Sequence, residues 1–102
     1  MRYQPLELGQ AGNPKCPDNY DNESTLICPA CRRIVVQVSG EPAVVQCGTM
    51  PQGVGLGAGS VQWQAEEPYM AGASLTFGRT FDAVRVRNYT PGKEAQIFVT
   101  VS

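Results

Sequence analysis

The chain has 102 residues, of which 42% are hydrophobic and 17% charged, and its formal net charge is −1. A chain of this length holds one domain at most, and its composition is too apolar for disorder and not cationic enough to hold nucleic acid by its phosphates. Histidine is absent, which excludes serine–histidine and cysteine–histidine nucleophilic sites within the chain. We therefore expect one small domain with no enzymatic activity and no nucleic-acid partner.

Membrane and export signals are also missing from the sequence. No apolar run approaches the ~18 residues that a membrane-spanning helix needs, and no hydrophobic signal region follows Met1. We therefore expect no membrane partner and a protein made in a reducing cytoplasm, where disulfides are uncommon.

The first half of the chain begins with irregular segments. Residues 1–15 contain two prolines and two glycines without an apolar period, so we expect an extended N-terminal arm. Residues 16–31 carry three cysteines around an insert rich in Asp and Asn, which predicts a loop. Residues 33–38 and 43–47 are rich in β-branched side chains and flank a Ser-Gly-Glu-Pro turn, a pattern that predicts a hairpin.

The next segments predict two short strands. Residues 61–65 place Val61, Trp63 and Ala65 on one face, and we expect Trp63 to be the largest residue of the core. A proline-containing break follows, and residues 73–77 predict another strand.

The C-terminal region has the clearest pattern. Val84 and Val86 alternate with Arg85 and Arg87, and residues 95–101 alternate in the same way, which is typical of strands with one buried face. A Pro-Gly turn between the two runs predicts a hairpin. The two arginines share a face and are expected to be solvated, with a charged subunit contact as the alternative.

These segments together predict an all-β fold. Several short strands separated by turn signals indicate a small antiparallel β-sandwich or barrel of about six strands, with an extended N-terminal arm and a cysteine loop. The expected organisation is an arm at residues 1–15 and a single β domain at residues 16–102, whose part 16–47 includes the cysteine cluster.

The cysteines form the one pattern that suggests a metal. Two residues separate the cysteines of the Cys-Pro-Ala-Cys element, a spacing that lets both sulfurs bind one ion. We therefore predict a zinc ion bound by all four cysteines. Its role would be structural, because four thiolates fill the coordination sphere and leave no position for water or substrate. One or two disulfides, or free buried thiols, are the alternatives. The predicted ligands are Cys16, Cys28, Cys31 and Cys47.

Residues 33–102 resemble small all-β virion structural proteins of tailed bacteriophages. The likeness is carried by the alternating runs 81–88 and 95–101, and by the glycine-rich stretch 48–59 that leads into Val61-Gln62-Trp63. The resemblance implies a non-enzymatic, homo-oligomeric decoration, cement, spike-base or fibre-base protein that binds capsid or tail subunits. Its expected location is the virion, assembled in the host cytoplasm. The alternatives are a small module that binds a carbohydrate or protein ligand, and a zinc-ribbon-type adaptor.

Overall fold

The computed structural model describes residues 6–28, 32–50, 61–77 and 81–102, and these residues form strands and connecting turns without a helix. The described part of the chain thus holds no helix that could cross a membrane. Its nine strands are β1 (Leu6–Leu8), β2 (Thr25–Ile27), β3 (Ile34–Ser39), β4 (Ala43–Thr49), β5 (Gln62–Trp63), β6 (Glu67–Tyr69), β7 (Ser74–Phe77), β8 (Ala83–Asn88) and β9 (Gln96–Val101).

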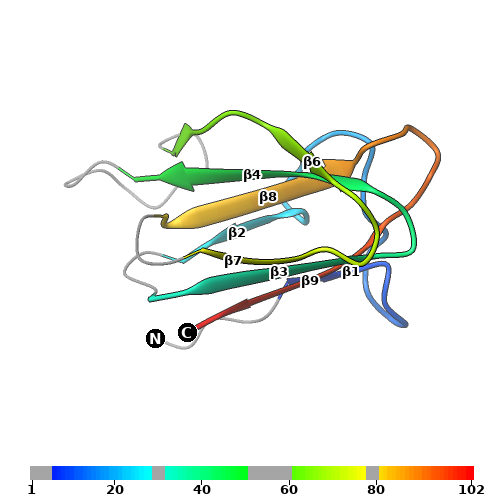
Figure 1. Cartoon of the computed structure of the whole chain (residues 1–102), viewed down its shortest axis with the longest axis horizontal. Coiled ribbons are helices and arrows are strands. Elements are labelled where there is room, and N and C mark those ends of the chain that lie inside the picture. Colours follow the sequence, from blue (N-terminus) through cyan, green and yellow to red (C-terminus); the bar gives the residue numbers. More distant parts are fainter. Residues whose placement is uncertain (1–5, 29–31, 51–60, 78–80) are drawn as a thin grey trace.

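The strands form two antiparallel sheets that face one another as a sandwich (Figure 1). Sheet A has the order β1-β9-β3-β7. Sheet B has the order β2-β8-β4-β5, and β6 pairs with β4 beside β5. The prediction of an all-β sandwich or barrel is confirmed, and the fold is the sandwich, although the described residues hold nine strands and not about six. The three unexpected strands are β1, β2 and β6, each only three residues long.

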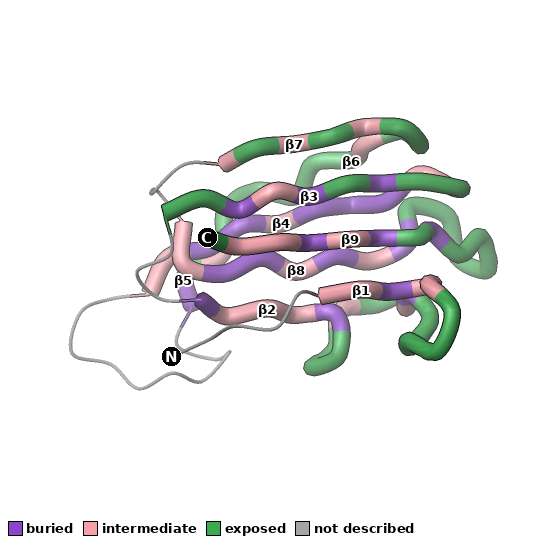
Figure 2. Tube along the Cα trace, turned by 90° about the horizontal axis from the view of Figure 1, so that it is seen from below, coloured by how far each residue is buried: buried purple, intermediate pink, exposed green. Residues whose placement is uncertain are grey.

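The core lies between the sheets and is built mainly from valine and isoleucine. Alternating residues of β3, β8 and β9 point inward, as the period of two predicts. Figure 2 shows the buried residues concentrated on the central strands, whereas β7 at the edge of sheet A is intermediate or exposed. The most fully buried aliphatic side chains are Leu8, Ile34, Val36, Val84, Val86, Ile97 and Val99.

Both predicted hairpins are wrong. β8 pairs with β2 and β4, whereas β9 pairs with β1 and β3, so the turn at residues 89–95 carries the chain from one sheet to the other. The connection from β3 to β4 crosses between the sheets in the same way. Alternation shows which face of a strand is buried, but it is equally compatible with a hairpin and with a crossing between two sheets that share one core.

The expected N-terminal arm is partly a strand. β1 pairs with β9 at the edge of sheet A, and Leu8 is only 1% exposed inside the core. Gly9 has φ of +77°, and its amide donates to the Pro14 carbonyl at 2.7 Å, so the chain turns directly after β1. A three-residue strand is too short to show a period, which explains why the sequence did not reveal it.

Asn88, at the end of β8, ties the first loop to the sandwich. It is 2% exposed, and its side-chain amide nitrogen donates to the Cys16 carbonyl at 2.9 Å and to the Asp18 carboxylate at 3.0 Å. Its side-chain oxygen accepts from the Ala95 amide at 2.9 Å. One buried side chain therefore joins β8, the crossing to β9 and the loop at residues 16–24.

Candidate functional site

The outer face of sheet B carries two arginines from its central strand. Because Val84 and Val86 point into the core, Arg85 and Arg87 point outward. Antiparallel pairing of β8 with β4 places Gln46 directly opposite Arg85. We use the name arginine–aromatic cluster for the side chains that gather here, which are Tyr20, Gln46, Trp63, Glu66, Arg85 and Arg87.

Arg85 is the centre of this cluster. Its guanidinium carbon lies 4.2 Å from the centre of the Tyr20 ring and 4.1 Å from that of Trp63, within the range of a cation–π contact. Its Nε donates to the Gln46 side-chain oxygen at 2.7 Å, and the Gln46 amide nitrogen donates to the Gln64 carbonyl at 2.6 Å. Two rings and one amide thus hold a single guanidinium in place.

Trp63 reaches Arg85 because the residue opposite it is glycine. β4 and β5 pair Gly48 with Trp63, and a Cβ atom at Gly48 would lie 2.9 Å from Cε3 of the indole and would also collide with Val61. Val61 and Trp63 share a face as expected, but it is the outer face of sheet B. The expectation that Trp63 belongs to the core is therefore wrong, since it is half-buried and lies outside the core cluster.

Tyr20 comes to the cluster from the loop before β2. Asp21 and Ser24 exchange hydrogen bonds that close a turn next to it, at 2.8 and 3.0 Å. The Tyr20 hydroxyl donates to the Glu66 carboxylate at 2.5 Å, and Nε of Arg87 donates to the same oxygen at 3.0 Å. Glu66 therefore connects the ring that covers Arg85 with the second arginine.

These contacts shift the pKa values of Glu66 and Tyr20 in opposite directions. The hydrogen bond from Tyr20, followed by that from Arg87, holds the pKa of Glu66 below its ordinary value. Burial, followed by the hydrogen bond to Glu66, raises the pKa of Tyr20 to about 12. The cluster is thus arranged around an ionised Glu66 and a neutral Tyr20.

Replacing Tyr20 with phenylalanine tests this arrangement. The variant Y20F keeps the ring over Arg85 but removes the hydroxyl that contributes most to the low pKa of Glu66. We expect the pKa of Glu66 to rise toward its ordinary value, as measured by NMR titration of its side-chain carboxyl carbon. The pKa of Asp18, which hydrogen bonds from Asn88 and Gly92 lower, serves as the internal control and should not change. An unchanged pKa of Glu66 would contradict the assignment of this hydrogen bond.

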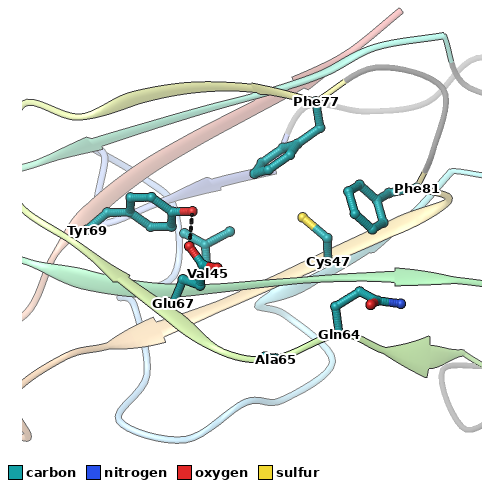
Figure 3. Close-up of a pocket in the computed structure, with 8 residues that line it drawn as sticks. All are labelled: Val45, Cys47, Gln64, Ala65, Glu67, Tyr69, Phe77 and Phe81. Carbon is teal, nitrogen blue, oxygen red and sulfur yellow. Dashed lines mark hydrogen bonds between the residues drawn. The ribbon is translucent and has the colours of Figure 1, made fainter.

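A second feature is a cavity of about 150 Å³ where β7 and the β5–β6 edge diverge (Figure 3). Phe77 and Phe81 meet edge to face at its wall, with ring centres 5.7 Å apart at 86°. The Tyr69 hydroxyl donates to Glu67 at 3.2 Å at the opposite end. The lining consists of Val45, Cys47, Gln64, Ala65, Glu67, Tyr69, Phe77 and Phe81.

The structure places Cys16 and Cys28 at opposite ends of β8. The Cys28 amide donates to the Asp82 carbonyl, whereas the Cys16 carbonyl accepts from Asn88, at the other end of β8. Six residues of extended strand separate these positions, about 20 Å. A zinc ion needs each sulfur within about 2.3 Å.

The described cysteines, with the described Asp and Glu residues, form no group of three that could hold a metal ion. Cys31 lies outside the described residues, as do residues 51–59 of the glycine-rich stretch. The arrangement gives the four-cysteine site no support, so zinc stays a prediction, which native mass spectrometry of the purified protein would test.

The buried thiols should make the free energy of unfolding depend on pH in the alkaline range. Burial, with nearby Asp21 and Asp18 adding to it, raises the pKa of Cys16 from 9.0 to about 12. Burial, with Glu67 adding to it, raises that of Cys47 to about 11. Because the folded state holds these protons more tightly than the unfolded chain, their contribution is complete below pH 9 and is lost as the pH rises toward 11–12.

We therefore expect the free energy of unfolding to fall between pH 9 and pH 10.5 in urea titrations. The free energy of unfolding of the variant C16A should fall less steeply with pH, because this variant lacks one titrating thiol. One titrating proton contributes at most about 1.4 kcal/mol per pH unit. The variant S39A, which changes an exposed hydroxyl, should keep the wild-type slope. Equal slopes in C16A and the wild type would show that Cys16 does not carry this dependence.

Sequence reasoning found only part of the cluster. Arg85 and Arg87 were expected to share a face, which is confirmed, but the two aromatic rings and Glu66 were not expected beside them. Tyr20 lies 46 positions before its hydrogen-bond partner Glu66, and no local pattern indicates that these residues meet.

Comparisons with known proteins found no match for the chain. No family model, no curated protein and no solved structure matches it. The likeness to virion proteins accordingly remains an expectation from the sequence, and the function has to be inferred from the geometry of the molecule itself.

Proposed function

We propose that this protein is a non-enzymatic binding module that contacts a partner protein through the arginine–aromatic cluster on the outer face of sheet B. The observation that carries the proposal is the Arg85 guanidinium held by the Tyr20 and Trp63 rings. Tyrosine, tryptophan and arginine are the residues most enriched at the centres of protein interfaces.

The cluster is held rigidly before any partner binds. Gly48 provides the space for Trp63, the Asp21–Ser24 turn sets the loop that carries Tyr20, and Gln46 holds Nε of Arg85. Association costs free energy when flexible side chains must be ordered, so side chains already fixed in place lose less on binding. This surface is therefore suited to a stable contact.

The resemblance of residues 33–102 to small virion structural proteins suggests where the protein acts. We propose that it is a homo-oligomeric structural component of a virion, and that its partners are capsid or tail subunits, which it reinforces. Many copies on a symmetric shell would add their contacts by avidity, so a single patch of modest size is sufficient. The all-β sandwich is compatible with this role.

Site-specific photo-cross-linking tests the proposal. A photoreactive amino acid replaces Pro68, exposed on β6, or Gln37, exposed on the outer face of sheet A as the matched control. Position 68 lies on the same face as Arg87, because both residues pair with Val44 of β4. We expect particles purified from the source of the protein to yield one discrete capsid or tail adduct from position 68 and none from position 37. Equal labelling from both positions, or none from position 68, would overturn the binding surface. A discrete adduct with a protein outside particles would overturn the virion setting alone.

A further inference from the structure

The two arginines of the cluster differ in how their charges are neutralised. Arg87 forms an ion pair with Glu66 at 3.0 Å and donates from Nη1 to the Asn88 carbonyl at 3.1 Å. Within the described residues, Arg85 has no carboxylate in salt-bridge distance, and its one hydrogen bond runs from Nε to Gln46. Its two terminal nitrogens therefore carry donors that no described residue accepts.

The surroundings of Arg85 orient these donors. The Tyr20 and Trp63 rings contact the guanidinium, and Gln46 occupies its Nε. The side chain is half-buried, so the terminal nitrogens lie at a surface that the rings partly shield from water. A planar guanidinium held in this way presents a fork of parallel N–H groups, which matches the two oxygens of a carboxylate.

We propose that the terminal nitrogens of Arg85 bind a single carboxylate, an Asp or Glu side chain on the surface of the partner protein. This inference rests on the proposed function, and it adds the chemistry that the partner must offer. A single carboxylate fits better than a polyanion, because the segments that carry Tyr20 and Trp63 also expose acidic side chains that would repel further negative charge. These are Asp18, Asp21, Glu66 and Glu67.

A small-molecule titration tests this directly. Trp63 is the single tryptophan of the chain, so its fluorescence reports on the cluster alone. The probe is N-acetyl-glutamic acid methylamide, and its neutral glutamine analogue is the control ligand. We expect the glutamate probe to produce a saturable change in Trp63 fluorescence and in the Arg85 Nε–H NMR signal, with a dissociation constant on the order of millimolar. The glutamine analogue should produce neither.

Three variants assign the effect to Arg85. R85K keeps the charge but loses the fork, and should weaken binding about tenfold. Q46E places a carboxylate beside the guanidinium and should abolish binding while the arginine remains. R33K makes the same exchange at an exposed arginine outside the cluster and should bind like the wild type. Spectra of ¹H and ¹⁵N nuclei confirm that each variant is folded.

Each contrary result overturns the inference. Equal binding of the glutamine analogue, unchanged binding by R85K, or tighter binding of a 12-nucleotide oligothymidylate would each show that Arg85 is not a receptor for a single carboxylate. The proposed function would survive these results if the photo-cross-linker at position 68 still captured its discrete partner. Failure of that cross-link, with glutamate binding intact, would overturn the function and not the carboxylate site.

Discussion

Replacing Asn88 with alanine should lower the free energy of unfolding by about 3 kcal/mol, since two buried backbone groups would lose their partner at about 1–3 kcal/mol each. In the native protein the Asn88 side chain bonds the Cys16 carbonyl and the Ala95 amide, and alanine can replace neither bond. Small domains are stable by only about 5–15 kcal/mol in total. The variant N88A should therefore unfold roughly 10–20 °C below the wild type.

Thermal unfolding followed by circular dichroism measures this loss. Asn19, exposed in the loop that Asn88 holds, provides the matched control, and N19A should unfold within about 0.5 kcal/mol of the wild type. Asp18 gives a second readout, because the hydrogen bond from Asn88, followed by that from Gly92, lowers its pKa. In N88A the pKa of Asp18 should rise toward its ordinary value. Equal melting temperatures for N88A and N19A would refute the view that Asn88 joins the loop to the sandwich.

Replacing Gly48 with alanine should cost about 2 kcal/mol, the typical penalty for adding a methyl group to a filled site. The new Cβ would lie 2.9 Å from the Trp63 indole and 3.1 Å from the Gln62 carbonyl, and it would also collide with Val61. Because the backbone carbonyl cannot move freely, we expect the indole to shift away from Arg85. The variant G48A should therefore lose both stability and the fixed position of the guanidinium.

Urea unfolding and Trp63 fluorescence detect the two losses separately. The emission of the single tryptophan should move to longer wavelength in folded G48A as the indole becomes more exposed. T49A, at the next position of β4, is the control and should keep the native emission. A G48A protein with native stability and native emission would show that the close approach of β4 and β5 is not needed for the cluster.

Much of the sandwich could be predicted from local patterns. Val84 and Val86 alternate with two arginines, and this alternation correctly assigned the inward and outward faces of β8. The turn at Gly92, with φ of +82°, likewise follows from its Pro-Gly sequence. Strand pairing could not be predicted in the same way, because a turn between two strands does not show whether the second joins the same sheet or the opposite one.

The candidate site was much harder to predict. The expectation that Trp63 lies in the core followed from its apolar neighbours on alternate positions, but a cross-strand glycine gives the indole room on the outer face. Tyr20 and Glu66 meet across 46 positions of sequence, and only the packing of the first loop over sheet B joins them. Contacts between residues so far apart in the sequence produce no pattern among neighbouring residues, so local sequence analysis does not detect them.

The amino-acid order alone therefore established an all-β domain, its main strands and the buried face of the longer ones, because period and turn chemistry act between neighbouring residues. The partners of each strand, the contacts of Arg85 with two aromatic rings and the separation of Cys16 from Cys28 arose only when the two sheets packed together. These properties depend on contacts between distant segments, and they are selected by the shared core and not by any local preference.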